Sequence, residues 1–233
     1  MTVPKALTSP LPWLLLLLSV TTGLVDAISV LGLGKVFTAN MTGNIVFLGF
    51  AAVGTPGFHA ASYLAAIAAF LIGALVAGRV GKGHAGLPLR RWLLVAALVE
   101  AALLWIAAGV ATGFDMASQS PGAALYAIIA LTGLAMGFRN ATIRQLKVPD
   151  LTTTVLTLTL TGLAADSTMA GGSNPNLARR IGSVAAIFLG AGIGAWMVLH
   201  GGLVLPLILA GALVLAGTLA CMLHPEARQI VAG

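Results

Sequence analysis

Long apolar stretches, separated by short polar interruptions, follow one another along almost the whole chain. Of its 233 residues, 59% are hydrophobic and 8% are charged, whereas a soluble globular domain has about 45–50% apolar and about 25% charged residues. So few charges cannot cover a water-exposed surface. One transmembrane helix needs about 20 apolar residues, and the hydrophobic residues of this chain are enough for several such helices. The sequence therefore predicts an all-α polytopic membrane protein with a single membrane domain over residues 1–233.

Hydropathy marks eight apolar segments. They are residues 11–33, 36–53, 60–78, 92–111, 123–142, 151–165, 181–199 and 203–223. The second segment opens with Thr and Asn residues, and the sixth is short and rich in Thr. Non-helical backbone persists in a membrane only where protein or a water-filled cavity satisfies it. We therefore predict about six transmembrane helices plus two re-entrant or broken polar segments.

Positive charge indicates the orientation. If six segments cross and the N-terminus is cytoplasmic, every Lys and Arg except Lys35 falls on the cytoplasmic side, as the positive-inside rule requires. The alternative is that all eight segments cross with the N-terminus outside. The apolar stretch at the start continues to about Leu33, which is typical of a retained span and not of a cleaved signal peptide. The expected location is the plasma membrane, with both termini in the cytoplasm.

Two halves of the chain, residues 11–111 and 123–223, resemble each other. Residues 23–27 align with residues 137–141, and residues 70–74 align with residues 188–192. Each half consists of a span, a polar segment and two further spans. Three spans are an odd number, so the second half is expected to be inverted relative to the first. Inverted repeats with paired broken segments recur in transporters, which bind their substrate near the midplane.

The first span carries a carboxylate well inside the apolar region, Asp26. An ionised group there must be neutralised, paired or in contact with water. Two interpretations remain open: a carboxylate that couples transport to a proton or another cation, and a structural group that caps the neighbouring broken segment. Its counterpart in the second half is Asn140, which has a similar shape but cannot titrate.

Glu100 lies near the middle of the fourth segment, and Arg139 lies near the end of the fifth. Glu100 is expected to be a second titratable group, the partner of a basic residue, or a protonated side chain bonded to its own helix. Arg139 could pair with Asp26 or Glu100. The favoured prediction is that Arg139 ends its span at the membrane surface, because Arg144 and Lys147 follow closely.

Polar side chains on the two broken segments complete the candidate site. The first segment contributes Thr38, Asn40, Thr42 and Asn44, with Gly43 permitting a turn. The second contributes Thr153 and Thr157, which lie one helical turn apart. Threonine in a membrane helix often bonds back to its own carbonyls, so a purely structural role is the alternative for these threonines.

Several function classes are not expected. The chain has no catalytic or nucleotide-binding motif, so we do not expect an enzyme. Its four His residues fall at span ends or in loops, and no cofactor or metal site is predicted. Nucleic acid is not an expected partner, because the basic residues are those of cytoplasmic loops. Gly-x-x-x-Gly pairs at residues 133–137 and 190–194 predict close helix packing, inside the chain or in a dimer.

The motif formed by Gly23, Asp26 and Ala27, followed by residues 36–44, resembles the first signature of the YoaK family. Residues 137–141 and the Thr-rich segment resemble its second signature. Family members tend to have a Thr-Gly pair soon after the paired threonines, whereas here that pair appears only at residues 161–162. The resemblance covers about residues 11–223. It implies a small multi-pass protein of the bacterial inner membrane with about six spans and no established substrate.

Taken together, the intramembrane acids and the paired broken segments predict a small secondary transporter or permease-like protein. Its partners would be the lipid bilayer and an unknown small solute or ion, bound at a proton-coupled polar site near the midplane. A non-transporting membrane scaffold or assembly factor is the alternative. A chain of this size is expected to act alone or as a homodimer.

Overall fold

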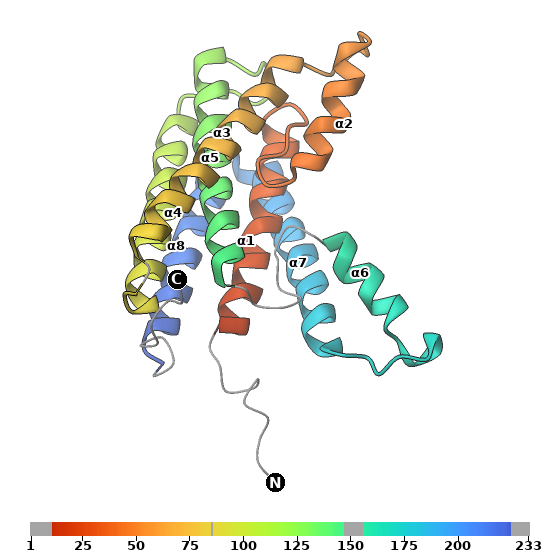
Figure 1. Ribbon diagram of the computed structural model, residues 1–233. Helices are drawn as coiled ribbons and strands as arrows, with labels where there is room; N and C mark the ends of the chain where they lie inside the picture. Colours follow the sequence, from red (N-terminus) through yellow and green to blue (C-terminus); the bar gives the residue numbers. More distant parts are fainter. Residues whose placement is uncertain (1–10, 85, 147–155, 225–233) are drawn as a thin grey trace.

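The computed structural model describes residues 11–84, 86–146 and 156–224. Within these described residues, six helices are long and apolar enough to cross a membrane; Figure 1 labels them. They are α1 (Leu11–Gly32), α3 (Ala60–Gly83), α4 (Leu89–Ala111), α5 (Gly122–Leu146), α7 (Leu177–Gly201) and α8 (Val204–Met222). The prediction of an all-α polytopic membrane protein with six spans is confirmed.

Two shorter helices interrupt this series, α2 (Met41–Ala52) and α6 (Leu156–Ala165), and a 3₁₀ helix, η2 (Thr168–Ala170), follows α6. At about 1.5 Å per residue, the 12 residues of α2 and the 10 of α6 reach about 18 and 15 Å. A hydrocarbon core is about 30 Å thick. Neither short helix can cross it alone, as expected of broken segments.

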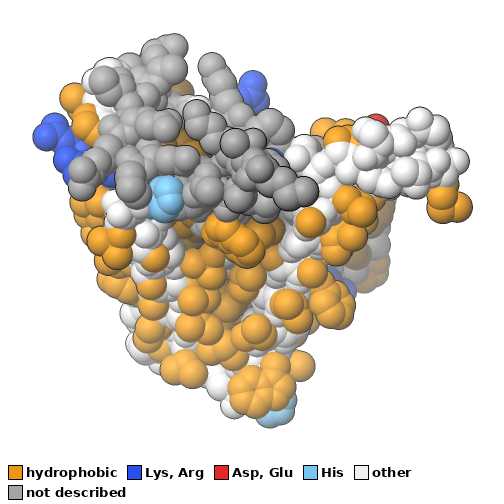
Figure 2. Space-filling view, turned by 90° about the horizontal axis from the view of Figure 1, so that it is seen from below, with side chains coloured by type: hydrophobic (Ala, Val, Ile, Leu, Met, Phe, Trp, Pro, Cys, Tyr) orange, Lys and Arg blue, Asp and Glu red, His pale blue; other side chains and the backbone are white. Residues whose placement is uncertain are grey.

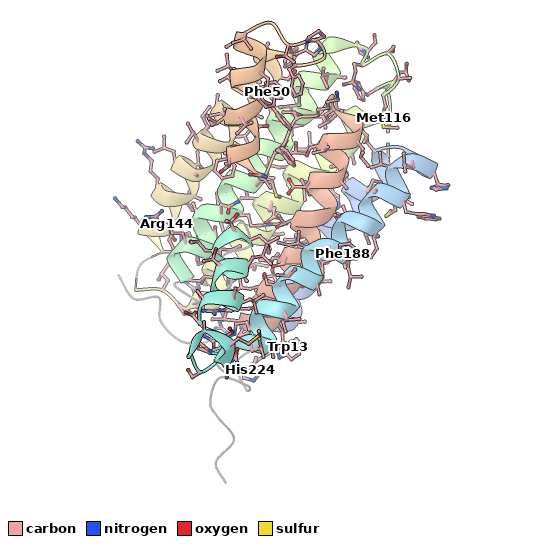
Figure 3. The ribbon with its side chains drawn as sticks, turned by 90° about the vertical axis from the view of Figure 1, so that its right-hand side faces the viewer. Trp13, Phe50, Met116, Arg144, Phe188 and His224 are labelled. Atoms are coloured by element: carbon pink, nitrogen blue, oxygen red, sulfur yellow. The ribbon has the colours of Figure 1, made fainter. Side chains whose placement is uncertain are left out.

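The six long helices form a bundle in which partners come from distant parts of the chain. Helix α1 packs along α7, and α3 packs along α5; α4 packs on both α5 and α8, and α8 also packs on α1. We call the end where α1 ends and α3 and α5 begin the upper end, as drawn in Figure 1. Figure 3 places Phe50 and Met116 at this end, and Trp13 and His224 at the opposite, lower end. Helix α2 lies toward the upper end against α3, and α6 lies toward the lower end against α7.

Glycines allow the two main helix pairs to approach until their backbones touch. A Cβ atom built at Gly23 would collide with the carbonyl oxygen of Ile187, and one at Gly190 with that of Val20. These contacts join α1 to α7. The predicted close packing at residues 190–194 is thus internal, since small residues are what permits such an approach.

The second pair, α3 and α5, has the same kind of crossing. A Cβ atom at Gly137 would collide with the carbonyl oxygen of Phe70, and one at Gly73 with that of Leu134. Gly133 also packs closely, with its built Cβ 3.1 Å from Ala69 Cβ. The Gly-x-x-x-Gly pair at residues 133–137 therefore also serves an internal interface.

The surface of the bundle is apolar along its length. Large side chains such as Leu71, Phe188 and Trp196 are more than half exposed, as expected of side chains that contact lipid. Figure 2 looks onto the lower end and shows hydrophobic side chains over much of the visible surface, with Lys and Arg at its margin. Basic residues cluster where α3 and α5 end and where α4 and α7 begin: Arg79, Lys82, Arg90, Arg91, Arg144 and Arg179.

Candidate functional site

A buried ion pair between Arg139 of α5 and Glu100 of α4 lies inside the bundle. The two residues are only 2% and 3% exposed. Arg139 Nε donates to Glu100 Oε1 at 2.7 Å, and Nη2 donates to the same oxygen. On the other side of the guanidinium, Nη1 donates to the backbone oxygen of Leu18 at 3.1 Å and to Thr22 Oγ1 at 3.0 Å. One arginine side chain therefore connects α1, α4 and α5.

The favoured prediction that Arg139 ends its span was wrong. Helix α5 continues to Leu146, and the Arg139 side chain points into the bundle. An arginine cannot lose its proton in a protein, so it can be buried only with an anionic partner and further acceptors. Glu100 and the α1 oxygens supply both. Arg144, which is exposed in the last turn of α5, occupies the helix-end position that was predicted for Arg139.

Asp26 lies on α1, one helical turn after Thr22, and contacts the segment that follows α1. Its carboxyl group accepts a hydrogen bond from the backbone N–H of Ala39, and the charge of Arg139 acts on it. Its Oδ1 atom is buried and has no hydrogen-bond donor among the described residues. The charge of Arg139 thus acts on both Asp26 and Glu100, but only Glu100 is directly bonded to it.

The segment between α1 and α2 is not helical, and Asn44 holds it in place. Asn44 is fully buried. Its Nδ2 donates to the backbone oxygen of Phe37 at 2.6 Å, and its Oδ1 accepts from the backbone N–H of Phe37 at 2.9 Å. Both peptide groups of a non-helical residue are thereby satisfied, as an apolar environment requires. Asn44 is a structural residue that fixes the segment beside Asp26.

The other polar residues of this motif have different surroundings. Asn40 is the N-cap of α2, with its side chain accepting from the backbone N–H of Gly43 at 3.3 Å, which is a common way to satisfy a helix start. Thr42 is exposed. Thr38 is fully buried, and its Oγ1 has no hydrogen-bond partner among the described residues. Asp26 and Thr38 are therefore the two candidates of the first half with an unsatisfied buried oxygen.

Among the described residues, helix α6 brings no predicted site residue of the second half to the polar groups around Asp26 and Arg139. Asn140 Nδ2 donates to the backbone oxygen of Met136 in its own helix at 2.8 Å. Thr157 is exposed on α6, and Thr153 lies outside the described residues. Helices α2 and α6 do not pack extensively against each other, so the expected meeting of the two polar segments is not seen in the described part of the chain.

Helix α6 is attached to α7 by a second charged pair. Arg180 Nη1 donates to Asp166 Oδ2 at 2.8 Å and to the backbone oxygen of Gly162 at 2.7 Å. The guanidinium lies close to Gly162, where a built Cβ atom would be 2.8 Å from Arg180 Cζ, so a side chain at this position would displace the arginine. Sequence reasoning missed this pair and also missed Thr22. The position of Thr22 four residues before Asp26, on the same helix face, was a signal that could have identified it.

A cavity of about 20 Å³ adjoins the Glu100–Arg139 pair and is bordered by Thr142 and Thr218. Its size suits a single water molecule. With Thr22 and the Leu18 carbonyl on the other side, the pair lies in a small polar region surrounded by apolar helices. Such a region can hold charge and exchange a proton, but it is too small for a solute.

Comparison with known proteins is consistent with this architecture. The family model "Protein of unknown function (DUF1275)" matches residues 14–220. The chain belongs to the DUF1275 family. Among curated proteins, the UPF0700 transmembrane protein YoaK of Bacillus subtilis (strain 168) is 36% identical over 157 residues, which are 66% of this chain and 65% of YoaK. The resemblance to the YoaK family is confirmed, and this DUF1275 protein is a multi-pass membrane protein. No solved structure matches it.

Proposed function

We propose that this DUF1275 protein is a small secondary transporter in which Asp26 binds the coupled proton. The observation that carries the proposal is an imbalance of charge among the described residues around Arg139: Asp26, which is half-buried with its Oδ1 fully buried, and Glu100 are two acids, and Arg139 is one base. If both acids are ionised, one negative charge remains without a counter-charge in the apolar interior. Intramembrane acids of this kind mark proton and ion pathways.

Asp26 is the acid suited to gain and lose a proton. Glu100 Oε1 is engaged by two N–H groups of Arg139, whereas Asp26 Oδ1 has no donor among the described residues. A proton on Asp26 would balance the charge. Its release would leave the carboxylate held by the Ala39 N–H and the field of Arg139. Each state would favour a different position of the non-helical segment that contains Ala39.

An inverted repeat would give this local event a global effect. The glycine contacts support it: Gly23 against Ile187 corresponds to Gly137 against Phe70, and Gly190 against Val20 corresponds to Gly73 against Leu134. These two glycine contacts between α1 and α7 thus correspond to those between α5 and α3, with α1 matched to α5 and α7 matched to α3. The correspondence places Gly73 on Gly190, one residue away from the alignment based on sequence. Inverted repeats let transporters expose one site alternately to the two sides.

The distribution of basic residues supports an orientation. We infer that the lower end is cytoplasmic, because the basic residues at the helix ends cluster there and the upper end has Lys35. The location would be the bacterial inner membrane, with both termini in the cytoplasm. The non-helical segment and α2 would then enter from outside, and α6 from inside.

The test is proton movement in liposomes that contain the purified protein and a pH-sensitive dye. A panel of amino acids, organic acids, sugars and amines is added outside, one at a time. We expect at least one solute to cause proton uptake, and we expect Asp26→Asn to abolish it. The matched control is Glu226→Gln, which neutralises an acid that follows α8 in the sequence and should leave the signal unchanged. Proton uptake that persists in Asp26→Asn would refute the role of Asp26.

One observation favours the second candidate function, a non-transporting scaffold. Asn40, Asn44 and the Asp26–Ala39 hydrogen bond all stabilise the fold locally, which is the structural interpretation of this motif. A scaffold should bind a partner protein with the same affinity in the wild type and in Asp26→Asn. Pull-down from solubilised membranes with both proteins distinguishes the two candidates.

A further inference from the structure

A second and larger cavity opens at the upper end of the bundle. Its volume is about 700 Å³, and it lies among the end of α1, the start of α3 and the start of α5. It is separate from the Glu100–Arg139 pair, which borders a different cavity. Its volume suits a small organic solute.

The charged and polar groups of this cavity favour an anion. Among the described residues of its lining, Lys35 is the one Lys or Arg, and none is Asp or Glu. The first residues of α3, Ala60 and Ala61, also line it. The N-cap residue His59 makes no side-chain capping hydrogen bond. A helix start has N–H groups without an acceptor in the helix and a partial positive charge, and anions bind at such positions. The Ser62 N–H already donates to the His59 oxygen at 3.1 Å, so the N–H groups of Ala60 and Ala61 are the ones that could bind an anion.

Backbone conformation at the cavity is unusual. Lys35 has φ of 63° and Gln119 has φ of 53°, in the left-handed region that non-glycine residues rarely adopt. Only four non-glycine residues of the described chain do this, and these two both line the cavity. Backbone strain of this kind tends to occur at ligand-binding and active sites.

The remaining walls specify the rest of the ligand. Leu33, Phe58, Leu125 and Tyr126 provide an apolar and aromatic surface. The amide of Gln119 is fixed by two hydrogen bonds, because Nε2 donates to the backbone oxygens of Gly32 at 3.1 Å and Met116 at 2.6 Å. Its Oε1 is buried and has no donor among the described residues. A ligand with a hydroxyl or amino group would supply that donor.

We infer that this cavity binds a small carboxylate with an apolar or aromatic body and a hydrogen-bond donor. The carboxylate would lie near Lys35 and the start of α3, and the donor would bond to Gln119 Oε1. The inference rests on the proposed function and names its substrate class. The ligand would contact residues 33–35, the beginning of the non-helical segment whose Ala39 N–H bonds to Asp26. Proton binding and anion binding would thus act on one segment.

The experiment measures binding by calorimetry with the full-length protein in detergent at constant pH, with no gradient. The probes are 3-phenyllactate, which has a carboxylate and a hydroxyl group, 3-phenylpropionate, which lacks the donor, and 3-phenylpropanol, which lacks the carboxylate. We expect phenyllactate to bind best, phenylpropionate more weakly and phenylpropanol not at all. Lys35→Gln should weaken phenyllactate binding about tenfold or more, as expected for a lost charge-assisted hydrogen bond. Lys35→Arg should retain most of the affinity.

The matched control is Lys82→Gln, which removes an exposed lysine at the opposite end of α3 and should not change binding. The inference is overturned if no probe binds to folded protein, if phenylpropanol binds as well as phenyllactate, or if Lys35→Gln has no effect. It is also overturned if phosphatidylglycerol displaces the probe, because a lipid headgroup would then be the ligand. Failure here leaves the role of Asp26 untouched, since that role is read from solute-driven proton uptake in liposomes.

Discussion

Removing Arg139 should destabilise the protein much more than removing Arg139 and Glu100 together. The substitution Arg139→Leu deletes four donated hydrogen bonds and leaves Glu100 buried without a counter-charge. Breaking a buried ion pair on one side costs about 3–5 kcal/mol. We expect the free energy of unfolding of Arg139→Leu to fall by about this amount.

The double variant Glu100→Leu/Arg139→Leu leaves no charge stranded at this position. Replacing a whole buried pair by apolar side chains is often neutral or stabilising. The acceptors that Arg139 vacates also keep a mutual partner, because Thr22 Oγ1 donates to the Leu18 oxygen at 2.8 Å. A hydrogen bond between membrane helices averages about 0.6 kcal/mol. We therefore expect the double variant to lie within about 1 kcal/mol of the wild type, with Glu100→Leu well below both.

The assay is reversible unfolding in mixed micelles, followed by tryptophan fluorescence and far-UV circular dichroism for the wild type, both single variants and the double variant. Arg144→Leu is the control, because Arg144 is an exposed arginine on the same helix and should change stability by about 0.5 kcal/mol or less. If the two single effects add up to the double effect within about 0.5 kcal/mol, the residues are not coupled. The ion pair would then not be an energetic link between α4 and α5.

Three further predictions concern other parts of the molecule. Gly137→Ala should lower the unfolding free energy by about 1–3 kcal/mol, because its side chain would overlap backbone of α3, whereas Gly78→Ala, which meets open space, should not; equal thermal shifts would contradict the close crossing. Asn44→Ala leaves the N–H and C=O of the half-buried Phe37 without their side-chain partner and should cost about 1–3 kcal/mol, so unchanged thermal stability would show that these two hydrogen bonds are dispensable. The Ser118 hydroxyl and two backbone N–H groups lower the pKa of Asp115 below its ordinary value of 3.8; the loop should keep this stabilisation above pH 3.8 and lose it as the pH falls through the lowered pKa, and an NMR titration that finds a carboxyl pKa at or above 3.8 would contradict the loop geometry.

Hydropathy alone predicted the spans because the bilayer leaves few alternatives. A segment of about 20 apolar residues in lipid must be a helix, so α1 and α8 could be predicted without knowing their neighbours. The two short helices could also be predicted, because Asn and Thr in an apolar chain mark backbone that needs side-chain partners. Asn44, which bonds both peptide groups of Phe37, is such a partner.

Partners between helices could not be predicted in the same way. From the sequence, Arg139 could pair with either of two acids or lie at the membrane surface. The nearby Arg144 and Lys147 favoured the surface position. What decided the matter was the packing of α5 on α4, which brings Glu100 to Arg139. A pattern along one chain segment does not contain that information. The upper cavity was missed for the same reason, because Lys35 and Gln119 line one cavity only after α1, α3 and α5 have packed.

The pairing of α1 with α7 and of α3 with α5 has a consequence for how the protein is made. Each pair consists of one helix from the first half and one from the second. When the first half has been synthesised, neither α1 nor α3 therefore has its main packing partner. The glycine-lined faces of α1 and α3 must remain unpaired, in the insertion machinery or in lipid, until α5 and α7 have been synthesised. Neither half is then a unit of assembly by itself, and fragments divided between α4 and α5 should be degraded when expressed singly but associate when expressed together.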